Sequence, residues 1–312
     1  MTSGKSAKPA RPAPRARRLL SGRRESAQAL LLFAPFFILF FIFTVLPVLS
    51  AFALSLTTYS VVRPPVFVGI DNYRYMLSED TVYLKAMTNT FIFAFFSGII
   101  GYLMSFTIAW VIDSLKGRMA FALAFYAPSI TSGIAMSIVW LYFFSPDSYG
   151  FINNALLQIG LLEKPMLWTK DPSLITFVVV FVSVWMGMGN GFLGFLAGFQ
   201  NLSPEISEAG RIDGVSNKLQ ELIFIILPQM KPMLLFGAIT AVANAFNIYD
   251  VPLTLAGSPG PENSSLTLVG HINDYAFTRL DLGYASTVAV FLFLTTFAIG
   301  QGLFRLLGSK SE

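Results

Sequence analysis

Three asparagines, Asn190, Asn244 and Asn247, lie inside long stretches of the chain that carry no charged residue. An amide side chain donates and accepts hydrogen bonds without carrying charge. Asn244 and Asn247 are three residues apart, so on a helix they would share one face. An amide that lacks a partner in an apolar environment costs free energy. The pattern therefore predicts either bonds between packed helices or contacts with a polar solute, and both interpretations stay open.

The composition excludes several other kinds of chemistry. The 312 residues include no cysteine and one histidine, so disulfides, thiolate sites and a cluster of histidine metal ligands are ruled out. A phosphate-binding loop is also absent, because Gly4-Lys5-Ser6 has neither the upstream glycine nor a preceding strand. We predict no catalytic residue, no cofactor and no metal site. We expect His271 to lie on the surface of a loop.

The elements that position these amides are membrane-spanning helices. The chain is 54% hydrophobic and 12% charged, whereas a soluble domain carries about 25% charged residues. Six stretches of 18 or more residues lack Asp, Glu, Lys and Arg, which is long enough to cross a bilayer as helix. They are continuously apolar rather than alternating, which argues against a β-barrel. We predict an all-α polytopic membrane protein with spans near 29–57, 86–112, 119–143, 174–199, 232–254 and 284–307.

The positive charges set the expected orientation. Residues 1–27 form a basic tail, which we expect to be disordered and cytoplasmic, ahead of a membrane domain at 28–308 and a short tail at 309–312. With the N-terminus inside, the cytoplasmic segments hold 15 Lys and Arg residues and the outer segments hold six. Both termini are therefore predicted to be cytoplasmic. The first apolar run is too long for the core of a cleaved signal peptide, and we interpret it as a retained helix.

The segment 201–231, between the fourth and fifth spans, has the pattern of two short helices. Ser203 and Pro204 form a helix start, with Glu205 where the helix dipole favours an acid. Gly214 suits a left-handed helix end, and Ser216 would cap a second helix that runs to Pro228. One face of the first helix would hold Ile206, Ala209, Gly210 and Asp213. The unit could dock into a partner's groove or lie on the membrane surface, and its mixed charge disfavours the membrane.

The stretch from Glu208 to Gly214 (Glu-Ala-Gly-Arg-Ile-Asp-Gly), followed by Ile-Leu-Pro228, resembles the EAA signature of binding-protein-dependent ABC importer permeases. The form with Asp-Gly at its centre is similar to the carbohydrate branch, the maltose-type large permease subunit. Two departures stand out. Gly210 replaces the usual alanine, and Ala256-Gly-Ser-Pro-Gly-Pro261 replaces the usual Thr-Gly-Gly-Pro. The resemblance covers about 28–307, with further matches at Gly69-Ile-Asp-Asn-Tyr73, Asn89-Thr90, Tyr149-Gly-Phe-Ile-Asn153, Trp185, Leu196-Ala-Gly198, Ala276-Phe277 and Leu282-Gly-Tyr-Ala285.

The resemblance implies a type I ABC importer permease fold in a bacterial or archaeal plasma (inner) membrane. In that family the permease is not an enzyme. It would form half of a pathway for a sugar or oligosaccharide, with alternating access driven by ATP. The implied partners are a second, distinct permease subunit, two ATP-binding cassette ATPase subunits, an extracytoplasmic sugar-binding protein and the membrane lipids; no nucleic acid is expected.

The resemblance also assigns roles to individual residues. A cytoplasmic coupling helix would meet the ATPase through Glu205, Glu208, Ala209, Gly210, Asp213 and Gly214. The carbohydrate would be bound by Ser129, Ser132, Met186, Gly187, Asn190, Asn244, Asn247 and Tyr249.

Three alternatives remain. An ABC permease for a polyol phosphate, peptide or amino acid is one, although an anionic solute would favour Lys or Arg inside the spans and none is found there. An ion-coupled secondary transporter is another, but such proteins usually bury charged relays, and only Asp250 lies near a span end. The third is a purely structural membrane subunit, which the polar residues of the fifth span disfavour.

Overall fold

The computed structural model describes residues 31–308, so the predicted tails at 1–27 and 309–312 lie outside the described residues. The side chains of Asn190 and Leu307 are likewise not described. The chain divides into two compact units, Met1–Ala53 and Leu54–Glu312.

All but the last residue of one long apolar helix, Leu31–Leu54, belongs to the first unit; this helix includes a π-helical turn at Phe41–Val45 and α2 (Leu46–Leu54). No residue of this helix is buried by protein. At 1.5 Å per residue, its 24 residues reach across the roughly 30 Å core of a bilayer.

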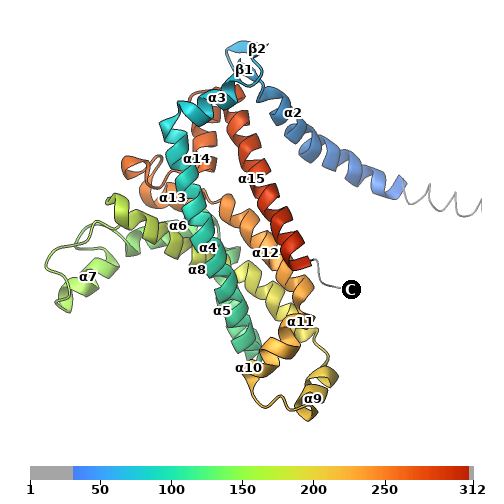
Figure 1. The fold of residues 1–312 in the computed structure, drawn as a ribbon. Coiled ribbons are helices and arrows are strands. Elements are labelled where there is room, and N and C mark those ends of the chain that lie inside the picture. Colours follow the sequence, from blue (N-terminus) through green and yellow to red (C-terminus); the bar gives the residue numbers. More distant parts are fainter. Residues whose placement is uncertain (1–30, 309–312) are drawn as a thin grey trace, which may run out of the picture. The chain divides into compact units, whose positions relative to one another are not determined.

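Four further helices of the second unit are long and apolar enough to cross a membrane: α4 (Thr81–Asp113), α8 (Pro172–Gln200), the pair α12 (Lys231–Phe246) and α13 (Asp250–Ala256), and α15 (Leu282–Gly308). The helix α4 packs against both α8 and α12, and α12 packs against α15 (Figure 1). Side-chain caps fix where two of these helices begin, because Asp80 accepts a bond from the Tyr83 amide and Asp171 accepts one from Ser173.

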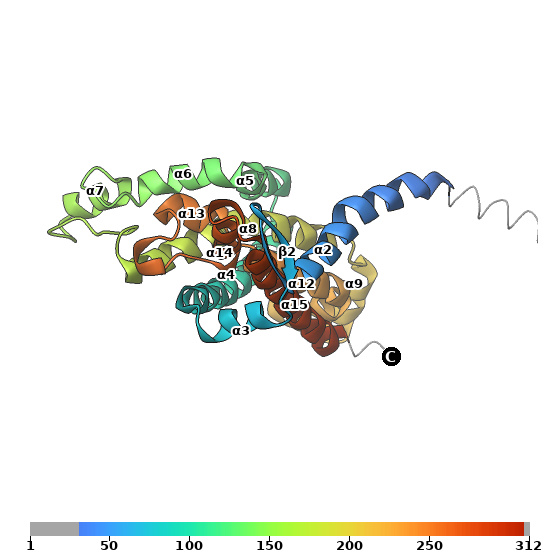
Figure 2. The same ribbon diagram turned by 90° about the horizontal axis from the view of Figure 1, so that it is seen from above.

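The third expected span, near 119–143, differs from the sequence prediction. It consists of α5 (Arg118–Ile130) and α6 (Gly133–Phe143), which are bent by 97° at Thr131 and Ser132. Pro128 lies in the last turn of α5, where a proline weakens the helix ladder. Figure 2 shows α5, α6 and α7 (Phe151–Gln158) following one another along one side of the second unit. Counting the bent pair as one span gives up to six candidate spans within residues 31–308, which confirms the predicted class of fold.

One end of the second unit carries a small hairpin that the all-α prediction did not include. The strand β1 (Thr57–Ser60) pairs antiparallel with β2 (Arg63–Phe67), with a bulge between Thr58 and Ser60. The remaining elements at this end are α3 (Asp71–Ser78), a 3₁₀ turn at Pro261–Asn263, α14 (Leu268–Asn273) and a π-helical turn at Asp274–Thr278 (Figure 1).

The opposite end carries the helix pair expected in 201–231 (Figure 1). It consists of α9 (Pro204–Ile212), α10 (Lys218–Glu221), the π-helical turn η2 (Leu222–Ile226) and α11 (Leu227–Gln229). Gly214 has the expected left-handed backbone, with φ of +99°. The cap of the second helix is Asn217, which accepts a bond from the Gln220 amide, rather than Ser216.

The interior of the second unit is apolar, and so is much of its surface. Buried side chains such as Val178, Val182 and Phe195 lie between helices, whereas large side chains such as Phe95 and Leu103 on α4 are more than half exposed. A soluble protein rarely exposes so many large apolar side chains together. Exposed apolar helices of this length indicate surfaces that face lipid.

Candidate functional site

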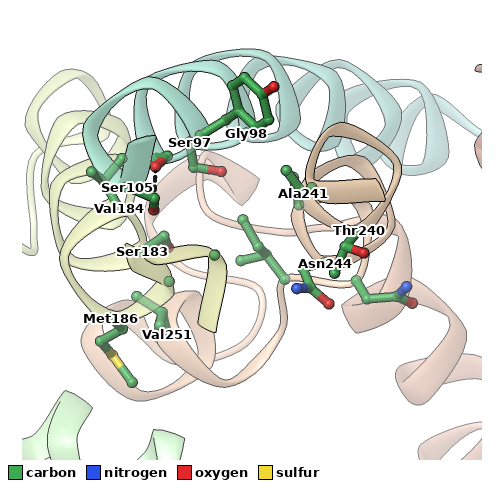
Figure 3. Close-up of a pocket in the computed structure, with 18 of the residues that line it drawn as sticks. Ser97, Gly98, Ser105, Ser183, Val184, Met186, Thr240, Ala241, Asn244 and Val251 are labelled. Carbon is green, nitrogen blue, oxygen red and sulfur yellow. Dashed lines mark hydrogen bonds between the residues drawn. The ribbon is translucent and has the colours of Figure 1, made fainter. Parts of the chain in front are cut away.

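A cavity of about 700 Å³ lies among α4, α8, α12 and α13, next to the start of α6 (Figure 3). Its wall is largely apolar, with a few hydroxyl and amide groups set into it. The polar side chains are contributed by four helices, α4, α8, α12 and α13, and by the short break between α12 and α13. They are Ser97, Tyr102, Ser105, Ser183, Thr240, Asn244, Asn247, Tyr249 and Asp250. An apolar pocket with a small set of polar groups is the usual form of a site for a small organic molecule.

The structure brings most of the sequence-predicted substrate residues to this cavity. Those that line it are Met186, Gly187, Asn244, Asn247 and Tyr249. Ser129 and Ser132 do not line it. The Ser129 hydroxyl donates to the carbonyl of Tyr126, and its side chain packs where a side chain on Gly189 would lie. Ser129 therefore serves the close approach of α5 to α8. The prediction for Asn190 concerns a side chain outside the described residues.

Asn244 and Asn247 do not sit on one continuous helix as the spacing suggests. The helix α12 ends at Phe246, and Asn247 adopts a non-helical cap conformation before α13 begins at Asp250. The Asn247 amide donates to the carbonyl of Ala243 at 2.8 Å. Asparagine competes in this way with the helix ladder, which is why it favours helix ends. Both amides are exposed, and both line the cavity.

Sequence reasoning missed several residues of the cavity wall, of which Ser183 is the most informative. Its hydroxyl oxygen is buried and has no hydrogen-bond partner among the described residues, although a buried hydroxyl normally finds one. Ser183 precedes Asn190 by seven residues, about two helical turns, so helical periodicity could have found it. Gly187 and Gly101 have open space where a side chain would be, so these glycines widen the cavity.

A second polar cluster lies away from the cavity and is buried. We call it the Asp80 cluster: Asp80, His271, Tyr275 and Tyr284. One carboxylate oxygen of Asp80 accepts a bond from the Tyr284 hydroxyl at 2.7 Å and lies 3.1 Å from Nε2 of His271. The expectation that His271 lies on the surface is wrong, since the residue is 1% exposed. The buried acid at the cap of α4 provides the partner that makes this burial possible.

Electrostatics within the Asp80 cluster favour an ionised acid and a neutral imidazole. Burial opposes ionisation of Asp80, but the Tyr83 amide, the Tyr284 hydroxyl and His271 outweigh it and hold the pKa of Asp80 below its ordinary value. Burial lowers the pKa of His271, more than the nearby carboxylate raises it. Burial and the Asp80 charge raise the pKa of Tyr275. The cluster ties α4, α14 and α15 together through one carboxylate.

The predicted docking residues of 201–231 stand on the surface. Glu205, Glu208, Ala209 and Asp213 are all exposed on or directly after α9. Gly210 faces the other way, because a side chain there would collide with Ile225 of η2. The Arg211 guanidinium lies 3.9 Å from the Glu221 carboxylate. The two helices of 201–231 therefore pack against each other through the face that holds Gly210, and the acidic face of α9 remains exposed.

Within the part of the chain that the structure describes, no group of three or more His, Cys, Asp and Glu side chains is placed to hold a metal ion. No protein-family model matches the chain.

Curated relatives match nearly the whole length of the chain. The probable ABC transporter permease protein YesP of Bacillus subtilis is 30% identical over 86% of this chain and 86% of its own length. The lactose transport system permease protein LacF of Rhizobium radiobacter is 31% identical over 84% of this chain and 87% of its own. The arabinooligosaccharides transport system permease protein AraP of Bacillus subtilis is 29% identical over 91% and 90%.

The fold has a close counterpart among solved structures. A chain in the crystal structure of a bacterial ABC transporter involved in the import of the acidic polysaccharide alginate has a TM-score of 0.80. It is 19% identical, and the match covers 95% of this chain and 100% of that one. A chain in the crystal structure of a bacterial alginate ABC transporter in complex with an alginate pentasaccharide-bound periplasmic protein gives a TM-score of 0.79.

Proposed function

The chain belongs to the permease subunits of sugar ABC transporters, and we propose that it forms half of the pathway by which an ATP-driven importer takes up a sugar or oligosaccharide. The observation that carries this proposal is the cavity. Its hydroxyl, amide and aromatic groups are those that bind a neutral polyhydroxylated solute, and they are set between helices long enough to cross a membrane.

The proposed assembly has two permease subunits, two ATPase subunits and an extracytoplasmic sugar-binding protein. The relatives named as permeases of transport systems support the role of permease subunit. The periplasmic protein in the alginate transporter complex supports the extracytoplasmic sugar-binding protein. The Lys and Arg distribution supports cytoplasmic termini. That orientation would put 201–231 on the cytoplasmic side, where the ATPase subunits work.

The helix α9 is proposed as the coupling helix. Its exposed acids, Glu205 and Glu208, would pair with basic groups at the rim of a groove in the ATPase. Closure of the ATPase dimer would then move α9, and with it the packed η2, so that the pathway opens outward. Hydrolysis would return it to the inward-facing state. The permease contributes different affinities for sugar in the two states.

Uptake into proteoliposomes tests the coupling. The chain is reconstituted with its partner subunits, and import of sugar is measured with ATP inside and binding protein outside. Glu208→Lys and Gly214→Pro are expected to abolish uptake while the chain still inserts, and Glu163→Lys, an exposed acid outside 201–231, serves as the matched control. Normal uptake by the Glu208 and Gly214 variants refutes the coupling role.

The role of the cavity is tested by removing one hydroxyl. Ser183→Ala is expected to lower the maximal uptake rate, because Ser183 lines the cavity and its hydroxyl, which has no partner among the described residues, would find one in a bound sugar. Ser137→Ala is the control, since the Ser137 hydroxyl bonds the carbonyl of Gly133 and does not line the cavity. Equal uptake rates for the two variants would argue against a sugar contact at Ser183.

A further inference from the structure

The cavity wall carries a single kind of charge. Among the described residues that line it, Asp250 is the one charged side chain, and no Lys, Arg or His is present. The other polar groups are hydroxyls and amides, which are neutral. The wall therefore has a net negative charge that no nearby cation offsets.

The position of this carboxylate is fixed by a close approach between two helices. Asp250 is the first residue of α13 and packs against the start of α6. Its Oδ2 lies 2.9 Å from the place that a side-chain Cβ on Gly133 would occupy, so only glycine leaves room for it. Gly133 begins α6, an 11-residue helix, and the positive end of a helix dipole stabilises a nearby anion.

The carboxylate also remains open to the cavity. Asp250 is exposed, and no described residue forms a hydrogen bond or ion pair with its side chain. An aspartate side chain carries two oxygens that act as hydrogen-bond acceptors in its carboxylate form. A fixed, unpaired charge on the wall acts on every solute that enters.

We propose that Asp250 makes the pathway selective by charge, so that it admits neutral and amino sugars and disfavours sugars that carry carboxylate, sulfonate or phosphate groups. This inference rests on the proposed function of the cavity as the sugar pathway. Even at the dielectric constant of water, the interaction of two unit charges 4 Å apart changes a binding equilibrium constant about fivefold. Beside protein the effective dielectric constant is lower, so the change is larger. Discrimination of about tenfold is therefore expected.

The test uses charged thiol reagents in place of the unidentified sugar. Because the chain has no cysteine, Asn247→Cys places its only thiol on the cavity wall, three residues before Asp250. The full chain is assembled with its partner subunits in membrane vesicles and treated with one of two methanethiosulfonate reagents. One reagent carries a cationic trimethylammonium group, and the other carries an anionic sulfonate group. Modification of this chain is followed by mass spectrometry, and the ratio of the two rates is taken, since the thiolate fraction cancels in that ratio.

Asp250→Asn is expected to lower the ratio of the cationic to the anionic rate by about tenfold, and Asp250→Glu is expected to preserve it. Thr240→Cys provides the remote control, because it lies about 10 Å further along α12 from position 247, near the screening distance of salt. The ratio at Thr240→Cys should change much less.

The outcomes separate this inference from the proposed function. An unchanged ratio at position 247 in Asp250→Asn overturns the charge selectivity and leaves the pathway intact. An equal change at both cysteines also overturns it, because a local charge acts over a short range. Failure of both cysteines to react with either reagent shows that the cavity is closed to solutes, which overturns the proposed pathway itself.

Discussion

Replacing Asp80 by alanine should destabilise the protein strongly, although Asp80 lies outside the cavity. The change removes the side-chain cap of α4, which contributes about 1 kcal/mol. It also leaves the buried Tyr284 hydroxyl and His271 imidazole without their acceptor, at about 1–3 kcal/mol each. Together these losses amount to about 3–7 kcal/mol.

The assay is thermal unfolding of the purified chain in detergent, followed by loss of monodisperse protein on size exclusion. A loss of 1 kcal/mol lowers Tm by about 2–4 °C in a protein of 150–250 residues, so Asp80→Ala should melt about 10 °C below the parent. The matched control is Asp274→Ala, at the same end of the unit. It removes a partly exposed pair with Arg279, which contributes at most about 1 kcal/mol.

Two results would refute this reasoning. If Asp80→Ala melted within about 2 °C of the parent, the buried bonds would contribute little. If Asp274→Ala lowered Tm by as much as Asp80→Ala, the effect would not depend on burial.

Three further predictions concern other parts of the chain. Because both the acid and the imidazole of the Asp80 cluster have folded pKa values below their ordinary ones, acid favours the unfolded chain. The contribution of the Asp80 cluster to the free energy of unfolding is fully present above pH 6.5, the ordinary pKa of the His271 imidazole, and falls as the pH drops below it. It falls again below pH 3.8, the ordinary pKa of the Asp80 carboxyl. Tm measured from pH 8 to pH 4 should show the first of these two losses. Asn153→Ala should open the segment 144–171 to proteolysis, because the buried amide donates to three carbonyls and accepts two further bonds. Asn154→Ala should not, because this half-buried neighbour donates one long bond to the Ser148 carbonyl. Gly210→Ala should reduce uptake because its side chain collides with Ile225, and a second change, Ile225→Val, should restore it.

The sequence predicts the class of fold and the number of long apolar helices well, because an uncharged apolar stretch of 18 or more residues is typical of a helix that crosses a bilayer. It does not predict where a span is interrupted. Pro128 is compatible with a continuous or a bent helix, and the packing of α6 against α13 and α8 that accompanies the 97° bend is not visible in the sequence. The break at Asn247 lies directly before the point where α13 packs against α6, and spacing in the sequence cannot reveal that packing.

The residues whose prediction was wrong or incomplete depend on distant partners. His271 is buried because Asp80, 191 positions earlier, accepts its bond. Gly210 departs from the family pattern, and the sequence alone gives no reason; the structure supplies one in Ile225, which fills the space of the missing side chain. Gly214 was predictable because its left-handed backbone is a local requirement.

The two interrupted helices, at 131–132 and 247–249, have a consequence for hydration. Non-helical backbone at bilayer depth leaves amide and carbonyl groups without ladder partners, which hydrocarbon does not tolerate and water does. The Asn247–Tyr249 break lines the cavity, and water there would bond the backbone groups that the helix ladder leaves without partners. A polyol entering it exchanges one set of hydrogen-bonding neighbours for another rather than being stripped of water, and the barrier to its passage is correspondingly low.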